Sequence, residues 1–428
     1  MHKSPAILGL ILISGCGGGD SVPEAILSGS SILSRPEGCR GLPAADLETA
    51  LATALPGDRL CLEPGEFVGR VIVPEGVTVF GPRTAVIRTQ GTGTTVTLTS
   101  SSALIGLTVD GSGGRFDVLD AAVRISGDDV RVLGIAVRNS IFGILSEKSK
   151  RAVIVGNHVV GSGGVALGMR GDGIRLWETN DSRVEDNLVE ASRDCVVWYS
   201  GRNLVRRNRV VGGRYGVHLM YSHDNRVLDN RFESNEVGVF VMYSRNARIE
   251  RNRMLGSDGA SGIGLGLKES GALTIRQNWL IRNTTGIFSD NSPMDEGQTN
   301  RFEDNELRLS NVGVNFLSSP QHNEFRRNLF HDNFAQVRVD GGGDAMGVVW
   351  DQNDWDDYAG YDLDGDELGD IPYTLEDLGA ELEARYPDLA FLHGTPALAL
   401  VSVAGRAVPL FAPKPILVDP APRFGRRR

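Results

Sequence analysis

Histidine and methionine gather in one short stretch of the chain. The segment GVHLMYSHD contains His218, Met220 and His223, and the similar segment GVFVMYS contains Met242. Alternate side chains of an extended strand point to the same face, so His218 and Met220 should share one. Thioether sulfur and imidazole nitrogen are soft ligands that suit Cu(I) better than Ca²⁺ or Mg²⁺. These four residues are therefore candidate copper ligands.

A plainer interpretation exists for the same residues. The methionines would fill gaps between coils, and Tyr221 would stack on Tyr243. Taken alone, the residues favour this structural role over a metal site. Met169, near the start of a longer insertion, is a weaker additional candidate ligand.

Acidic residues alternate in a second segment, DLDGDELGD. Asp362, Asp364, Asp366 and Asp370 supply carboxylates, and Gly365 allows the loop to bend. Ca²⁺ prefers such clustered oxygen ligands, although the segment is shorter than an EF-hand loop and lacks its flanking helices. The segment is a candidate structural calcium site; the alternative is an acidic turn whose aspartates accept bonds from backbone amides.

The elements that carry these residues repeat. Asn187, Asn208, Asn230 and Asn252 recur every 21 or 22 residues in the phrases EDNLV, RRNRV, LDNRF and ERNRM. The apolar runs between them are short, alternate with period two, and show no helical stripe. Such a repeat predicts an all-β, right-handed parallel β-helix of about 22 residues per coil.

Stacked coils place equivalent residues about 4.8 Å apart. Asn208, Asn230 and Asn252 should therefore form a buried ladder in which each side chain satisfies backbone groups and the next amide. We interpret this ladder as scaffold, not as a binding site. One period from Met220 leads to Met242, so these two side chains should lie side by side.

The repeat divides the chain into four parts. Residues 1–16 read as a lipoprotein signal, 17–40 as a flexible tether, 41–350 as the β-helix, and 351–428 as an acidic, helical and Pro-rich extension. The extension either caps the last coil or docks onto a partner. Expected elements are helices at 44–55, 375–386 and 396–410, strands at 59–62, 70–73 and 77–79, and an extended tail at 412–424.

The cysteines indicate an exported protein. Ile13-Ser14-Gly15-Cys16 follows a short apolar stretch and is similar to a bacterial lipobox, in which Cys16 is lipidated and anchors the chain to the membrane; an ordinary secretory signal is the alternative. In an oxidising compartment, Cys39 and Cys61 should form a disulfide. Cys195 is then left over, either as a small core residue or as a reactive thiol or soft ligand.

Composition and motifs narrow the function. A net charge of −10 argues against a nucleic-acid binder. The chain lacks the Gly-His-Gly and Asn-Thr-Asp motifs of pectin-cleaving β-helices and the Asp-Pro-His-Asp motif of alginate epimerases. The adjacent acids Asp128 and Asp129 are more simply a turn. We therefore expect a protein that is not an enzyme, with a carbohydrate-binding or polysaccharide-processing β-helix, or a calcium-stabilised surface solenoid, as alternatives.

Several phrases together resemble one family, NosD, the periplasmic β-helical maturation factor of nitrous oxide reductase. They are LPGDRLCLEPGEF, GDGIRLWE, GVHLMYSHDNRV, GVFVMYSRNARI, NDWDDYAGYDLDGDELGDIPY and the closing RYPDLAFLHGTPAL and AVPLFAPKPILVDPAP. The likeness extends over roughly residues 42–424. The acidic block and the Pro-rich tail are its most specific parts.

The resemblance implies delivery of copper, not catalysis. Family members work with an ABC-type ATPase, its membrane permease and a copper chaperone to supply the copper–sulfide centre of nitrous oxide reductase. His218, Met220 and Tyr221 match the family's HxMY motif, which strengthens the copper interpretation, and the tail becomes a candidate docking element for the membrane subunit. The chain differs from the usual pattern in its lipobox, in Gly17 after Cys16, in the Cys39 and Cys61 pair, and in Cys195.

Overall fold

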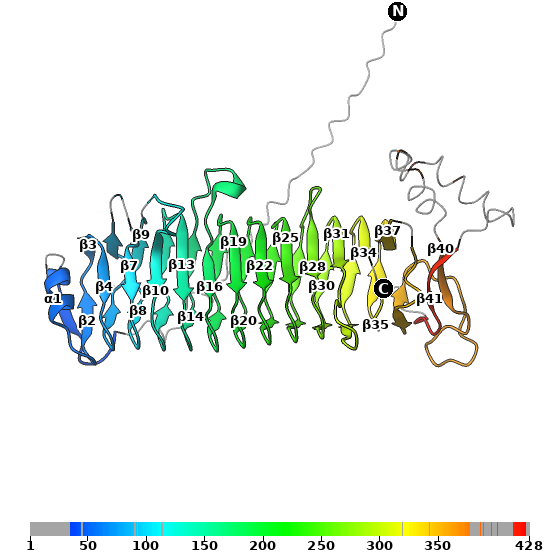
Figure 1. Cartoon of the computed structure of the whole chain (residues 1–428), viewed down its shortest axis with the longest axis horizontal. Helices are drawn as coiled ribbons and strands as arrows, with labels where there is room; N and C mark the ends of the chain where they lie inside the picture. The colour runs from blue at the N-terminus through cyan, green and yellow to red at the C-terminus, as the bar shows by residue number, and fades with distance from the viewer. Residues whose placement is uncertain are drawn as a thin grey trace, which may run out of the picture.

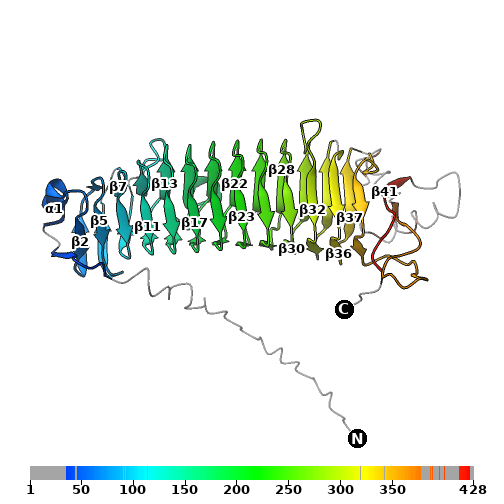
Figure 2. The same ribbon diagram turned by 90° about the horizontal axis from the view of Figure 1, so that it is seen from below.

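The protein is one elongated solenoid of stacked coils (Figure 1). The computed structural model describes residues 35–43, 46–89, 91, 93–112, 114–318, 320–341, 343–376 and 414–424, together with Tyr386, Asp388, Thr395 and Leu400. Three long parallel sheets run along the solenoid, and each complete coil contributes one strand to each sheet (Figures 1 and 2). The predicted parallel β-helix is confirmed.

The first sheet has 14 strands, which begin the coils. They are β1 Arg40–Leu42, β2 Arg59–Leu62, β5 Thr78–Phe80, β8 Ala103–Ile105, β11 Arg131–Leu133, β14 Val153–Val155, β17 Arg183–Glu185, β20 Leu204–Arg206, β23 Arg226–Leu228, β26 Arg248–Glu250, β29 Thr274–Arg276, β32 Asn300–Glu303, β35 Asn323–Arg326 and β38 Val349–Asp351.

The second sheet has 13 strands, each a few residues after a strand of the first. They are β3 Gly65–Val68, β6 Ala85–Arg88, β9 Thr108–Asp110, β12 Ala136–Arg138, β15 His158–Val160, β18 Leu188–Glu190, β21 Arg209–Val211, β24 Arg231–Glu233, β27 Arg253–Leu255, β30 Trp279–Ile281, β33 Glu306–Arg308, β36 Leu329–His331 and β39 Asp354–Trp355.

The third sheet has 12 strands, many of them longer than those of the other two. They are β4 Val71–Val73, β7 Val96–Leu98, β10 Ala121–Ile125, β13 Phe142–Glu147, β16 Ile174–Trp177, β19 Asp194–Trp198, β22 Tyr215–Met220, β25 Val237–Met242, β28 Ile263–Lys268, β31 Thr285–Asp290, β34 Val312–Leu317 and β37 Ala335–Asp340.

Side chains alternate between the core and solvent along these strands. In β23, for example, Val227 is fully buried between an exposed Arg226 and a half-buried Leu228. Valine, isoleucine and leucine fill most of the core, whereas the last coils hold stacked aromatic rings. Phe302 lies 4.2 Å from Phe325, and Phe330 lies 4.3 Å from Trp355, between ring centroids. Burial of this continuous apolar column stabilises a stack in which no coil could fold alone.

The asparagine ladder forms as the repeat predicts. Asn230 Oδ1 accepts from the backbone N–H and the side-chain amide of Asn208 at 2.9 and 3.0 Å. The Asn230 amide in turn donates to Val205 O at 3.0 Å and to Asn252 Oδ1 at 2.9 Å. The ladder is a buried hydrogen-bond network that fixes the corner between the first and second sheets.

Loop length changes along this ladder. Its step is 21 residues from Asn187 to Asn208 and 22 from Asn208 to Asn230, but 30 from Asn157 to Asn187. The expected 22-residue period therefore describes the central coils. Longer coils keep the same corner and place their extra residues in loops.

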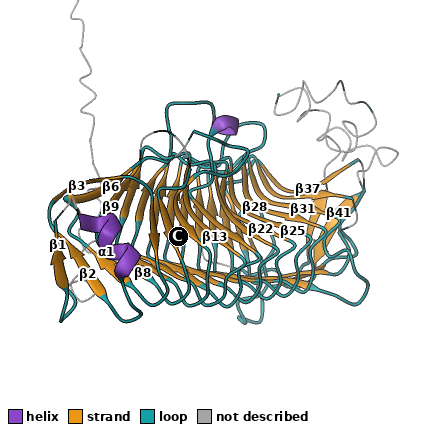
Figure 3. Ribbon diagram, turned by 60° about the vertical axis from the view of Figure 1, so that its left-hand side comes forward, coloured by secondary structure: helices purple, strands orange, loops and turns teal. Residues whose placement is uncertain are grey.

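Helix α1 (Leu47–Thr53) covers the N-terminal end of the solenoid (Figure 3). Its buried Leu47, Ala50 and Leu51 face the core, and the helix contacts β4. Cys39 and Cys61 form a disulfide with Cα atoms 5.6 Å apart, joining β2 to the segment that precedes β1. The helix thus shields the apolar core at the N-terminal end from solvent and hinders pairing with the strand edges of other molecules.

A short antiparallel pair covers the C-terminal end. Strand β40 (Tyr373–Glu376) pairs with β41 (Pro415–Asp419) beside the last coil (Figure 1). Asp419 is fully buried, and its Oδ2 accepts from the backbone N–H and amide of Asn353, each at 3.0 Å. The same oxygen accepts from Trp355 Nε1 at 3.1 Å. A carboxylate therefore replaces the next asparagine at the end of the ladder.

Most expected elements are present with small shifts. The strand at 59–62 is found unchanged, those at 70–73 and 77–79 are Val71–Val73 and Thr78–Phe80, and the first helix is shorter at Leu47–Thr53. The helix expected at 375–386 is wrong at its start, because Leu375 pairs with Leu417 in the terminal hairpin. Residues 377–385 and the helix expected at 396–410 lie outside the described residues, Leu400 excepted. Within the described ranges, no helix has the length and hydropathy of a membrane span.

Candidate functional site

The candidate copper ligands lie on the outer face of the third sheet. Met220 ends β22 and is paired in register with Met242 at the end of β25. His218 lies two residues before Met220, and both side chains are half-buried on the side away from the core. The predicted alignment of the two methionines is confirmed. We call His218, Met220 and Met242 the soft-donor patch.

The His218 imidazole is deeply packed although it points outward. Its ring centroid lies 4.7 Å from that of Tyr215 and 6.1 Å from that of Phe240. Nε2 is buried and has no hydrogen-bond partner among the described residues. An unpartnered buried nitrogen costs free energy unless a ligand uses it.

Burial also sets the charge of this side chain. It lowers the pKa of His218 to about 4, while nearby Asp194 acts in the opposite direction. The ring is therefore neutral at neutral pH, which is the form that binds metal ions. A neutral imidazole nitrogen and two thioether sulfurs on one face are the donor types that a soft cation prefers.

Two other candidates lie apart from this face. His223 is exposed in the turn after β22, and its Nδ1 accepts from Arg245 N at 3.1 Å. Met169 is 70% exposed in the 3-10 helix η3 (Leu167–Met169). The structure therefore places His218, Met220 and Met242 on one outer face, whereas His223 and Met169 lie away from it.

A buried ionic cluster, missed by sequence reasoning, adjoins the patch. Asp172 Oδ1 accepts from Arg193 Nη2 at 2.7 Å, and its other oxygen lies 3.3 Å from Arg175 Nη1. Asp194, at the start of β19, binds Arg214 Nη2 at 2.5 Å. Burial raises the pKa of Asp172, whereas Arg193 lowers it. The sequence signal that could have revealed this cluster is the acid and arginine in GDGIR and again in SRDC, one coil later.

An aromatic ridge borders the patch on the same edge of the third sheet. It contains stacked tyrosines, with ring centroids 5.2 Å apart for Tyr199 and Tyr221 and 4.7 Å apart for Tyr221 and Tyr243. All three have positive φ, at 49°, 48° and 51°, which is rare for bulky residues. The predicted Tyr221–Tyr243 stack is confirmed, and Trp198 extends the ridge toward the preceding coils.

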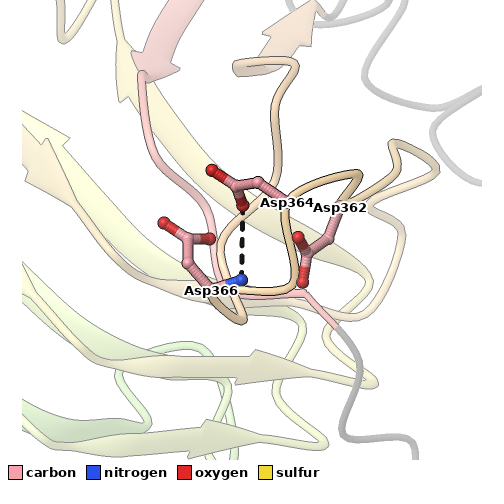
Figure 4. A group of neighbouring side chains, drawn as sticks. All are labelled: Asp362, Asp364 and Asp366. Carbon is pink, nitrogen blue, oxygen red and sulfur yellow. Dashed lines mark hydrogen bonds between the residues drawn. The ribbon is translucent and has the colours of Figure 1, made fainter.

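The acidic loop lies at the C-terminal end of the solenoid, against the C-terminal cap (Figure 1). Asp362, Asp364 and Asp366 each offer an oxygen, and the three oxygens lie within 4.8 Å of one another (Figure 4). Asp362 also accepts from Gly365 N at 2.7 Å, and Asp364 accepts from Asp366 N at 3.3 Å. The loop thus combines the two predicted alternatives: its carboxylate oxygens are clustered, and its aspartates also accept hydrogen bonds from backbone amides of the turn.

Asp370 lies outside that cluster and closes the loop differently. One of its oxygens accepts from Leu363 N at 2.6 Å. The cap holds the loop through Gly369 N, which donates to Pro422 O at 2.7 Å, and Phe424 N, which donates to Glu367 O at 2.9 Å.

The remaining candidates have structural roles. Cys195 is buried against the core, which raises the pKa of its thiol to about 12 and keeps it protonated. Asp128 accepts from Lys150 N at 2.9 Å, and Asp129 pairs with Arg151 at 2.6 Å across adjacent turns. Cys16 and the signal segment lie outside the described residues.

The fold defines a class: capped parallel β-helix proteins, here with a histidine and two methionines on an outer sheet face. Solved structures agree on the fold. The A-module of a mannuronan C-5 epimerase from Azotobacter vinelandii is similar with a TM-score of 0.50 and 15% identity, covering 71% of this chain and 92% of that one. The alginate lyase AlyF-OU02 is similar with a TM-score of 0.50 and 14% identity, covering 76% and 86%.

Sequence comparison goes further. Residues 151–360 match the family described as "Periplasmic copper-binding protein (NosD)". The "Probable ABC transporter binding protein NosD" of Stutzerimonas stutzeri is 27% identical over 367 residues, 82% of this chain and 84% of the relative. Its namesake in Pseudomonas aeruginosa is 29% identical over 379 residues, 82% and 85%. The chain is thus similar to NosD proteins over most of its length, and the matching family is described as periplasmic.

Proposed function

We propose that the protein is a non-enzymatic periplasmic maturation factor that binds copper transiently at the soft-donor patch. It would supply the copper–sulfide centre of nitrous oxide reductase together with an ABC-type ATPase, a membrane permease and a copper chaperone. Lipidation of Cys16 would anchor it to the cell envelope, and the C-terminal cap would face the permease.

One observation carries the proposal. His218 presents a neutral, buried and unpartnered Nε2 on the same face as two methionines that the coil register aligns. If His218 had only a structural role, its buried Nε2 would be expected to have a hydrogen-bond partner in the protein. The family description and the printed names of the relatives support copper and an ABC transporter system.

Replacing Met220 and Met242 together by alanine should weaken Cu(I) binding by about 100-fold or more, because only one ligand remains. The affinity is measured by competition with a chromophoric Cu(I) chelator under anaerobic conditions. The matched control is the Met169→Ala/Met294→Ala double variant, which removes two methionines that are 70% and 56% exposed outside the patch. Equal Cu(I) affinity in the two double variants would show that the assigned ligands are wrong.

We further propose that the acidic loop binds Ca²⁺ in a structural role. Calcium at 10 mM should raise the melting temperature of the protein by about 2 °C, since an ion held only by the folded state stabilises it. Asp364→Asn/Asp366→Asn should remove this increase, whereas Asp344→Asn, an exposed aspartate outside the loop, should keep it. A melting temperature of the native protein that is identical in calcium and in chelator would contradict the proposal.

A further inference from the structure

The soft-donor patch has a neighbour that none of the ligand motifs includes. Met220 is paired in register with Trp198 on the preceding coil, just as it is paired with Met242 on the following one. The outward column at this position therefore reads Trp177, Trp198, Met220, Met242, Lys268 and Asp290 along the third sheet. Its two methionines lie between an aromatic pair and an ion pair.

The ion pair cannot complete a metal site. Lys268 Nζ lies 3.3 Å from Asp290 Oδ2, and an ammonium group has no lone pair for a cation. A soft cation bound by Met220, Met242 and His218 would thus meet charge repulsion on the Lys268 side. The other end of the methionine pair is bounded by the Trp198 side chain.

The Trp198 ring is held by neighbours on its far side. Its centroid lies 4.7 Å from that of Trp177, and the guanidinium carbon of Arg175 lies 5.4 Å from it. Trp198 Nε1 is buried without a hydrogen-bond partner in the described part of the chain. Packing, not a hydrogen bond, therefore fixes this indole beside Met220.

We propose that Trp198 forms one wall of the soft-cation site and places the π system of its indole against the bound ion. The inference rests on the proposed function, because the ion is the one that the patch binds. An indole face attracts cations electrostatically and most strongly when water is excluded, so it suits an ion that loses its hydration shell easily. Trp198 would thus favour a monovalent soft cation over divalent ones while contributing no conventional ligand atom.

Silver(I) is the probe, since it is soft, monovalent and redox-inert. It is added to the full chain in a Cys195→Ala background, so that the thiol does not compete. Tryptophan emission should be quenched in proportion to bound silver, and Trp198→Phe should remove most of that quenching. It should also weaken silver binding by about threefold, because a phenyl ring still attracts the ion but less strongly than an indole.

Trp279→Phe is the matched control, because Trp279 is 40% exposed on the second sheet. It should leave the silver affinity unchanged and most of the quenching intact. In case Trp198→Phe perturbs folding, 5-fluorotryptophan labelling of the unaltered chain gives a second measurement. The ¹⁹F resonance of Trp198 should then shift more than those of Trp279, Trp350 and Trp355.

The two proposals fail in different ways. If silver binds and depends on Met220 and Met242, but Trp198→Phe changes neither affinity nor quenching and the Trp198 resonance does not move, this inference is overturned and the copper site stands. If Met220→Ala/Met242→Ala leaves silver binding unchanged, the proposed site is wrong and the inference falls with it.

Discussion

Replacing Asn230 by alanine is expected to lower the free energy of unfolding by about 4 kcal/mol, because several buried polar groups lose a partner at about 1–3 kcal/mol each. Asn208 loses the acceptor for both its backbone N–H and its amide, which lie 2.9 and 3.0 Å from Asn230 Oδ1. Val205 O and Asn252 Oδ1 each lose a donor. Water cannot replace these bonds easily, since Asn230 is 1% exposed.

The prediction is checked by urea denaturation against two variants of the same coil. Asn225 is equally buried but makes only two hydrogen bonds of this kind, with Asn203 N and Ser200 O. Asn225→Ala should therefore lower the free energy of unfolding by about half as much. Arg231→Ala removes an outward residue with a surface ion pair to Glu233 and should cost at most about 1 kcal/mol. Similar losses of unfolding free energy in all three variants would mean that the asparagine ladder stabilises the coil no more than other side chains do.

The periodic part of the fold could be predicted because one rule repeats in every coil. A buried asparagine marks the same corner each time, so counting from Met220 leads to Met242, and the register confirms it. The same rule predicts which residues point outward, and therefore that His218 and Met220 share a face. Local sequence was sufficient here because each coil contacts only its neighbours.

The parts that depend on distant contacts could not be predicted. Outward-pointing His218 is half-buried, with its Nε2 buried, because Tyr215 and Phe240 pack against it, and the alternation of a strand does not show this. Asp172 and Asp194 lie on adjacent coils and share Arg193, but the repeat does not show that their carboxylates are buried. His223 lies outside the predicted site because the turn after Tyr221 places its ring beside the backbone N–H of Arg245. Such contacts depend on insertions and turns that vary from coil to coil.

The C-terminal cap is the clearest case of a distant contact. The composition of the tail does not distinguish a cap from a docking segment. Asp419 lies 66 residues beyond Asn353, the residue to which it is hydrogen-bonded. In the structure, β41 pairs with β40, and Ile416 O accepts from Ala345 N at 2.7 Å. The described part of the tail, residues 414–424, therefore covers the last coil.

Asp419→Ala is accordingly expected to unfold the C-terminal end of the solenoid at a cost of about 4 kcal/mol. The substitution leaves Asn353 N, the Asn353 amide and Trp355 Nε1 without their acceptor, and bonds to a carboxylate are stronger than neutral ones. Asp419→Asn should cost less, because its remaining oxygen can still accept from these groups and only the bond from Ala421 N is lost.

The loss should also be local, since coils contact only their neighbours. Hydrogen exchange should show faster exchange of the amides in β38 and β39, while those of β22 and β25 keep their protection. The acidic loop is held by the same tail through Gly369 and Phe424, so Asp419→Ala should weaken any calcium-dependent stabilisation as well. Unchanged protection of Asn353 and Trp355 in the alanine variant would contradict this role, because these two residues hold the ladder's last bonds.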